Sequence, residues 1–462
     1  MMSTHLTEHR DRGRNLRKSV PRSSHGDWAP SVDRPDPVDL IESQNADRVG
    51  WLVPIRRVRM VETPFTFYRG SAKIMACDLA AAQSPDLQVQ LCGDAHLSNF
   101  GVFASPERRL LFDLNDFDET LPGPFDWDVK RLAASLVIAA EDRGWDRATG
   151  RGLAIESTKA YRESMASFAE QSWLKTWYSK VPVDDLLALA KTQGASKKQV
   201  KRGKRFIRKA KSKDHLQAAK GLIEFDNDRF RFKSEPPLLI PLRDIPLDVA
   251  PDELRDSVRK DFADYRSSMG DDVARLLDRY DLVDIAMKVV GVGSVGTRCM
   301  IALLVGRGPN DILLLQIKEA SQSVLEEYLP PSRYEESGQR VVEGQRLMQA
   351  ASDIFLGWSR SSRSGHHYYW RQLKDWKGSV DVAKSSEEAL MRYGKLCGLI
   401  LARAHAVSGD PAAISGYLGK GHVFDEAMGE FAVRYALQNR EDHAAFAAAI
   451  EDGRLEAAEL PA

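Results

Sequence analysis

Two short stretches in the first third of the chain bring together the side chains that phosphoryl transfer requires. Residues 93–101 read Gly-Asp-Ala-His-Leu-Ser-Asn-Phe-Gly, and residues 112–119 read Phe-Asp-Leu-Asn-Asp-Phe-Asp-Glu. Phosphoryl transfer needs an Asp that orients or accepts the proton of the attacking hydroxyl, and an Asn and a second Asp that hold Mg²⁺. We therefore predict Asp94, with His96 beside it, as catalytic. The alternative is a metal-free polar loop in which Asp94 caps a turn and His96 is structural.

The carboxylates of the second stretch predict a divalent cation, because acidic groups this close repel one another unless a cation compensates them. The predicted Mg²⁺ ligands are Asn99, Asp113, Asp116 and Asp118. Calcium is the rival interpretation, since Asp-x-Asn-Asp-x-Asp resembles a calcium loop. However, the sequence lacks the Gly at the sixth position and the Glu at the twelfth that an EF-hand requires.

A second set of candidates lies about 200 residues later, where Gly-Val-Gly-Ser-Val-Gly occupies residues 291–296. A dinucleotide-binding turn would open a helix, but the residues after these glycines favour a strand, as in the loop that covers the nucleotide in kinases. We predict Gly291, Gly293, Ser294 and Gly296 as phosphate-binding; the alternative is a flexible hairpin turn.

Lys318 ends the apolar run Leu-Leu-Leu-Gln-Ile-Lys, and buried strands rarely carry an unpaired lysine. We predict that Lys318 binds the phosphates of a nucleotide and pairs with Glu343 in the following helix. The alternative is an edge lysine that points to solvent.

The elements that must position these residues are a hairpin and a small sheet. The hairpin is predicted over 102–103 and 110–113, next to the first two stretches. Five strands with a helix after the third predict a small antiparallel lobe, and most of the remaining chain has helical patterns. The strands are expected at 284–290, 298–305, 312–318, 354–358 and 367–373, and the helix at 335–351.

These motifs resemble the protein-kinase-like superfamily, in particular its aminoglycoside and choline phosphotransferase branch. The resemblance rests on Cys92-Gly-Asp-Ala-His-Leu-Ser-Asn99, with Cys92 in place of the usual His, and on Phe125-Asp-Trp-Asp128. It implies a two-lobe fold in which Asp94 is the catalytic Asp, Asn99 is a Mg²⁺ ligand and Asp128 braces the catalytic loop. The resemblance gives two candidates for the second Asp that binds Mg²⁺. The spacing from Asn99 favours Asp113, whereas the local sequence Asp-Phe-Asp favours Asp116.

Beyond about residue 45 the chain also resembles an uncharacterised bacterial family, catalogued as domain of unknown function 2252. The signatures are Pro-Phe-Thr-Phe-Tyr-Arg-Gly at 64–70 and the two stretches described above. This family resemblance implies little about the substrate.

The order of the motifs departs from that of kinases, in which the glycine loop and lysine precede the catalytic Asp. The simplest reconciliation is a circularly permuted kinase-like fold of class α+β, whose two halves meet in one ATP cleft. The expected parts are a disordered arm at 1–47, a catalytic-loop half with a helical lobe at 48–280, a β-rich nucleotide-binding lobe at 281–380 and completing helices at 381–462.

Composition excludes some classes of protein. The 66 basic and 66 acidic residues cancel, so the whole chain has no charge that would attract nucleic acid. The four cysteines are scattered without a CxxC pair, and no run of about 18 apolar residues occurs. We therefore expect a cytoplasmic protein without a membrane or nucleic-acid partner.

Two basic groups stay open to more than one interpretation. The basic segment 191–220 is interpreted as a solvated helical hairpin or as a phosphate- or nucleic-acid-binding patch. Arg56, Arg59 and Arg69 precede the catalytic loop and are interpreted as ligands of an anionic substrate or of the γ-phosphate, or as structural ion pairs.

The leading hypothesis is an ATP- and Mg²⁺-dependent phosphotransferase that acts on a hydroxyl of a small molecule. The alternatives are AMP transfer to protein or autophosphorylation on the same fold, a pseudokinase-like nucleotide-binding module, and metal-dependent hydrolysis. The sequence leaves the acceptor and the oligomeric state open.

Overall fold

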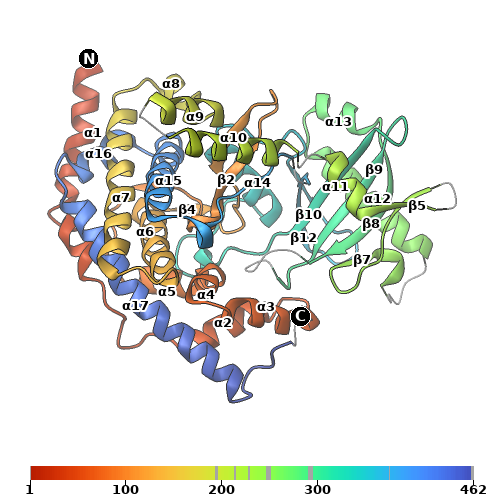
Figure 1. Ribbon diagram of the computed structural model, residues 1–462, viewed down its shortest axis with the longest axis horizontal. Coiled ribbons are helices and arrows are strands. Elements are labelled where there is room, and N and C mark those ends of the chain that lie inside the picture. Colours follow the sequence, from red (N-terminus) through yellow and green to blue (C-terminus); the bar gives the residue numbers. More distant parts are fainter. Residues whose placement is uncertain are drawn as a thin grey trace.

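The computed structural model describes residues 2–192, 196–212, 215–226, 229–245, 251–289, 295–373 and 375–458. Most of the long helices gather at one end of the molecule, and a six-stranded sheet with further helices beside it lies at the other, with two short antiparallel strand pairs and one helix between them (Figure 1). The predicted α+β class is confirmed. No helix in these described ranges is long and apolar enough to cross a lipid bilayer.

Four long helices form the core of the helical part. They are α6 (Phe125–Asp142), α7 (Arg147–Ala169), α15 (Glu387–Ser408) and α17 (Val423–Glu451). All residues of α6 from 125 to 140 are buried, as expected of a helix with protein on every side. Because this helix also carries Asp and Arg side chains, those groups must find partners inside the protein.

The sheet is antiparallel and has the order β11-β12-β10-β9-β8-β7. The helix α14 (Ser337–Met348) connects β10 to β11, as predicted. The sixth strand, β7, was not predicted as a member of this sheet, because it has three residues and ends in proline. The strands are β7 (Leu239–Pro241), β8 (Asp281–Lys288), β9 (Cys299–Val305), β10 (Ile312–Glu319), β11 (Gly357–Arg360) and β12 (His367–Gln372).

The strand β10 is buried along its whole length, with alternate side chains on opposite faces of the sheet. Leu313, Leu315 and Ile317 pack in one hydrophobic cluster with α12 (Pro251–Ser267), while Leu314 packs in a separate cluster. Lys318 follows Leu314 by four residues on the same strand, so the two side chains point to the same face of the sheet. This is the face opposite to α12.

Two short antiparallel pairs carry the first group of candidate residues. β1 (Gln88–Leu91) pairs with β4 (Leu121–Pro124), and β2 (Phe100–Ala104) pairs with β3 (Leu110–Leu114). The predicted hairpin is therefore present. Both pairs lie between the helical part and the sheet, as Figure 1 shows for β2 and β4.

The segment predicted as a disordered arm is instead helical. α1 (Met2–Leu16) packs against α16 (Pro411–Leu418), and α2 (Pro37–Asn45) follows. Gly13 and Gly416 permit the close approach, since a Cβ on either would lie within 2.2 Å of the opposite backbone. The polar composition was misleading because a few buried side chains, among them Trp28 and Ile41, and the ion pairs of Arg34 with Asp78 and Asp442 hold this segment on the rest of the protein.

The remaining helices include those that carry the predicted basic segment 191–220. This segment falls on the end of α9, on α10 and on most of α11, so its helical interpretation agrees with the structure over the described residues. The remaining elements are α3 (Val53–Val61), α4 (Pro64–Gly70), α5 (Ala72–Ala80), α8 (Trp173–Trp177), α9 (Val183–Thr192), α10 (Lys197–Lys211), α11 (His215–Leu222), β5 (Ile223–Asp226), β6 (Arg229–Phe232) and α13 (Asp271–Leu277).

Candidate functional site

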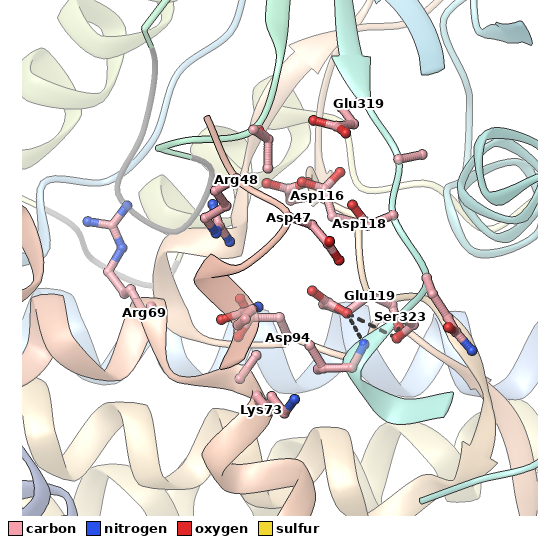
Figure 2. Close-up of a pocket in the computed structure, with 18 of the residues that line it drawn as sticks. Asp47, Arg48, Arg69, Lys73, Asp94, Asp116, Asp118, Glu119, Glu319 and Ser323 are labelled. Atoms are coloured by element: carbon pink, nitrogen blue, oxygen red, sulfur yellow. Dashed lines mark hydrogen bonds between the residues drawn. The ribbon is translucent and has the colours of Figure 1, made fainter. Parts of the chain in front are cut away.

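A cavity of about 340 Å³ lies where the two parts of the molecule meet. Three stretches distant in sequence form its walls: residues 43–73, residues 92–119 and residues 297–327. Figure 2 shows Arg48 and Arg69 on one side of the cavity and Glu119 and Ser323 on the other, with Asp94 between them. The predicted residues Asp94, His96, Asn99, Asp116 and Asp118 all line it.

The loop that presents Asp94 turns sharply at Gly93. Gly93 has a φ of +84°, and a Cβ there would lie 2.3 Å from the carbonyl oxygen of Glu119, so only glycine fits. The Asp94 carboxylate accepts a hydrogen bond of 2.8 Å from Nε of Arg131 on α6, and Nη2 of the same guanidinium lies 2.7 Å away. Burial raises the pKa of Asp94 although Arg131 opposes the shift, which favours a role as a proton acceptor.

His96 lies next to this carboxylate, with its Nε2 3.5 Å from Oδ2 of Asp94. Burial and the nearby positive charges of Arg69 and Arg131 lower the pKa of His96 well below its ordinary value. The imidazole is therefore neutral at neutral pH. Its buried Nδ1 has no hydrogen-bond partner within the described part of the chain.

Asp128, near the start of α6, stabilises the same loop through the loop's backbone. Its carboxylate accepts hydrogen bonds from the backbone N–H of Cys92 (2.7 Å) and of Gly93 (3.0 Å), and Nε2 of His405 on α15 lies 3.3 Å away. The kinase resemblance implied that Asp128 braces the catalytic loop, and these contacts agree with that role.

Replacing Asp128 by Ala is expected to lower the free energy of unfolding by about 2–4 kcal/mol, because two buried N–H groups lose their acceptor. Urea unfolding followed by circular dichroism measures this. The control is Glu141→Ala on the same helix, whose ion pair with the half-exposed Arg440 contributes at most about 1 kcal/mol. Equal losses in the two variants would contradict the proposed brace.

Asn99 ties the two candidate stretches together. Its amide Nδ2 donates to the carbonyl oxygens of Asp94 (2.8 Å) and Asp116 (3.2 Å). The side chain is buried, so the spacing between the catalytic loop and the acidic stretch is fixed by a direct bond. The amide oxygen of Asn99 remains as the atom that suits a cation.

Lys318 reaches the acidic stretch from β10 and is 3% exposed. Its Nζ donates to Asp118 at 2.6 Å and to Asp116 at 3.4 Å, and the hydroxyl of Tyr369 on β12 donates to Asp118 at 2.6 Å. Burial alone would lower the pKa of Lys318, but the two carboxylates raise it well above its ordinary value, so the ammonium stays charged. The predicted alternative of a solvent-facing edge lysine is wrong.

The pKa values of these two carboxylates shift in opposite directions. Burial and the neighbouring charge of Asp118 raise the pKa of Asp116. Burial would also raise the pKa of Asp118, but the ammonium of Lys318 and the Tyr369 hydroxyl lower it. Asp118 is therefore the firmly ionised partner of Lys318, and Asp116 is the more weakly compensated carboxylate.

Asp113 is a structural residue outside the cavity, which corrects its prediction as a metal ligand. It is completely buried, and its carboxylate accepts hydrogen bonds from the backbone N–H groups of Leu114 and Ala350, at 2.9 and 2.8 Å. It thereby connects β3 to the segment after α14. Asp113 lies within the buried strand β3, whereas Asp116 and Asp118 follow the end of that strand and line the cavity.

Glu343 does not pair with Lys318, so that predicted ion pair is also wrong. Glu343 accepts a hydrogen bond of 2.9 Å from Arg346, one turn further along α14. The face of α14 that meets the acidic stretch carries Arg340, which donates to the carbonyl oxygens of Thr120 and Asp118. The helix is present as predicted, but it is rotated about its axis. The guanidinium of Arg340, and not the carboxylate of Glu343, therefore faces the acidic stretch.

The predicted phosphate-binding glycine loop is described only at its end. Gly291, Gly293 and Ser294 lie outside the described residues. Gly296 has a φ of +94° and its carbonyl oxygen accepts a hydrogen bond of 2.8 Å from the backbone N–H of Val49. The residues after α2 therefore hold the end of this loop near the cavity.

The cavity offers carboxylate and amide oxygens, the donor types that Mg²⁺ prefers. Within the described ranges no group of three or more His, Cys, Asp and Glu side chains is arranged to hold a metal. Mg²⁺ commonly takes only one or two carboxylates and completes its octahedron with water and substrate phosphates. Asp116, Asp118 and the amide oxygen of Asn99 are the residues that would hold it.

A family model described as "Uncharacterized protein conserved in bacteria (DUF2252)" matches residues 48–449. The chain belongs to this family. The match runs through the loop that carries Asp94, the acidic stretch, the sheet and α15, so it includes most of the residues that line the cavity. No curated protein and no solved structure matches the chain significantly.

Two residues of the site were not predicted from the sequence. Arg131 contacts Asp94, and Tyr369 contacts Asp118. A signal for Arg131 is present, since it lies on α6 three residues after Asp128, in a helix too apolar to leave a charge unpaired. Tyr369 gives no such signal. It contacts the site because the register of β12 against β10 places it opposite Lys318.

Proposed function

We propose that the protein is a Mg²⁺- and ATP-dependent phosphotransferase that acts on a hydroxyl group of a small polar molecule. One observation carries the proposal: Nζ of Lys318 contacts Asp116 and Asp118, which precede it by about 200 residues and lie beside Asp94 and Asn99. A lysine, a metal-binding pair and a base in one cavity are the parts that phosphoryl transfer uses.

The arrangement of the sheet supports a kinase-like lobe. A strand, a glycine-rich segment, a second strand, a third strand with a lysine and then a helix follow one another as β8, residues 291–296, β9, β10 and α14. This is the order in which kinases place the nucleotide-covering loop, the lysine and the helix that follows. Since the catalytic loop comes first in this chain, the proposal includes circular permutation.

The residues of the cavity divide the work in a simple way. Asp94 orients the acceptor hydroxyl and takes its proton, while Arg131 fixes the rotamer of Asp94. Lys318 binds phosphate oxygens, and Asn99, Asp116 and Asp118 hold Mg²⁺, which when bound neutralises charge on the phosphates. The contribution of the protein is positioning and electrostatic stabilisation.

The wall of the cavity indicates a polar acceptor. Its lining residues are mostly charged or hydroxyl-bearing, and none of those in the described ranges is Phe, Tyr or Trp. An extended apolar or nucleobase-type acceptor would gain little from such a surface. A volume of about 340 Å³ suits a small molecule.

The proposal predicts that Mg-ATP raises the melting temperature of the protein in a saturable manner, because a ligand that binds only the folded state stabilises it. Thermal-shift titrations with ATP, ADP and GTP, each with and without Mg²⁺, measure this. An ATP-consumption screen over polyols, sugars and amino alcohols then identifies the acceptor. No stabilisation by any nucleotide would contradict the proposal.

Mass spectrometry of the protein after incubation with Mg-ATP distinguishes the other reactions of the same fold. A gain of one phosphate indicates autophosphorylation, whereas a gain of AMP indicates nucleotidyl transfer. An unmodified protein that consumes ATP only with an added acceptor supports the leading proposal.

A further inference from the structure

We propose that the wall formed by residues 48–69 is a binding subsite for a phosphate-type oxyanion, held by Arg48 and Arg69, with the guanidinium of the buried Arg56 behind them. The inference deepens the proposed function, on which it rests for the identity of the reacting site, and it assigns an anionic group to a ligand of this cavity. All three arginines line the cavity that contains Asp94 and Asp116.

Of these three arginines, Arg69, in the last turn of α4, has the fewest hydrogen-bond partners among the described residues. Within the described part of the chain its guanidinium has no hydrogen bond or ion pair to a protein acceptor, and its Nε is buried. Figure 2 shows its side chain on the side of the cavity away from Glu119 and Ser323. Burial lowers the pKa of Arg69, and Asp94 and Asp116 oppose this shift only through space.

Within the described ranges, the hydrogen bonds of Arg56 and Arg48 go only to neutral groups. Arg56 is completely buried and donates to the amide oxygens of Asn45 and Gln44 and to the carbonyl oxygen of Gly70. Arg48 donates to the carbonyl oxygen of Val295 at 2.6 Å. The buried Nε of each has no partner within the described ranges.

Most of the carboxylates that line the cavity pair with other groups, and Asp116 lies 3.4 Å from Nζ of Lys318. Asp94 pairs with Arg131, and Asp118 pairs with Lys318. Glu119 accepts hydrogen bonds from the hydroxyl of Ser323 and the backbone N–H of Val324. Glu319 pairs with Arg298, and Glu327 pairs with Lys73. Among the residues that the structure describes, none of the three guanidinium groups on the opposite wall forms an ion pair with a carboxylate.

A buried charge without a hydrogen-bonded counter-charge is unfavourable, and a ligand that supplies the counter-charge recovers this free energy on binding. Phosphate oxygens suit the planar donor set of arginine, which forms two parallel hydrogen bonds to such groups. The geometry thus favours a dianionic oxyanion over a carboxylate or a neutral hydroxyl.

The oxyanion has two possible sources, a phosphate of the nucleotide or a phosphate already present on the acceptor. Inorganic phosphate probes the shared chemistry without ATP. Competition between phosphate and Mg-ATP then separates the sources: a competitive effect assigns the subsite to the nucleotide, and an additive effect assigns it to the acceptor.

The test is a thermal-shift titration of the full chain with sodium phosphate, with sodium chloride at matched ionic strength as reference. We expect saturable stabilisation of the wild type, and an apparent dissociation constant at least about 10-fold higher in Arg69→Gln, as expected when a charge-assisted contact to phosphate is lost. Arg48→Gln is a second variant, in case Arg69→Gln does not fold. The matched control is Arg57→Gln on α3, since Arg57 pairs with Glu42.

The subsite is supported if Arg57→Gln titrates like the wild type and the other variants do not. It is overturned if phosphate gives no saturable effect on the wild type, or if Arg57→Gln loses as much affinity as Arg69→Gln. Phosphate binding without Mg-ATP binding would contradict the proposed phosphotransferase and still support the oxyanion subsite, so the two failures are distinguishable.

Discussion

Replacing Asp94 by Asn is expected to reduce phosphoryl transfer by about 10²–10⁴-fold, the usual contribution of a positioned general base. The substitution removes the charge that accepts the proton but keeps an oxygen that can accept the hydrogen bond from Arg131. The position of Arg131 and the shape of the cavity are therefore retained. Mg-ATP should bind to the variant nearly as it does to the wild type.

The measurement is a steady-state rate with the acceptor found by screening, together with a thermal-shift titration of Mg-ATP. Asp86→Asn is the matched control, since Asp86 is exposed and lies eight residues before Asp94. Normal turnover by Asp94→Asn would remove Asp94 from the chemistry. Loss of both turnover and nucleotide binding would assign Asp94 to binding.

Replacing Lys318 by Met is expected to reduce turnover by about 10²–10³-fold, as found when a preorganised electrostatic contact is removed. The variant also leaves Asp116 and Asp118 without the ammonium that separates their charges. Repulsion between them should raise the pKa of Asp118 and lower the melting temperature of the protein in the absence of metal.

The same variant offers a test of the metal site that does not depend on activity. Mg²⁺ alone should stabilise Lys318→Met more than it stabilises the wild type, because the cation takes the place of the lost ammonium. Lys260→Met, at an exposed position of α12, is the control. Equal responses of Lys318→Met and the control to Mg²⁺ would show that Asp116 and Asp118 do not hold the metal.

Much of the fold could be predicted from local patterns. The hairpin of β2 and β3, the three consecutive strands β8–β10 and the helix α14 follow from runs of alternating or continuous apolar residues. Weak patterns were less informative. β7 is short and ends in proline, and the polar α1 is stabilised by close backbone contact with α16, which leaves no strong hydrophobic signal.

In the candidate site, too, local patterns predicted some side chains and did not predict others. Residue type and spacing identified Asp94, Asn99 and Lys318, since a polar loop after a strand and a lysine in an apolar strand are unusual. Spacing alone did not separate Asp113 from Asp116, because both lie within the same acidic stretch. The folded structure separates them, because Asp113 lies within β3 and accepts a hydrogen bond from the N–H of Ala350, whereas Asp116 lies beyond the end of β3 and lines the cavity.

The sequence by itself therefore determined the chemical inventory, two groups of residues of the types that phosphoryl transfer uses. Only the tertiary structure decided which members meet, because that depends on the rotation of α14 and on the register of β12 against β10. These long-range features brought Arg340 to the place expected for Glu343, and placed Tyr369 beside Asp118. They follow from the packing of the whole chain, which no local pattern encodes.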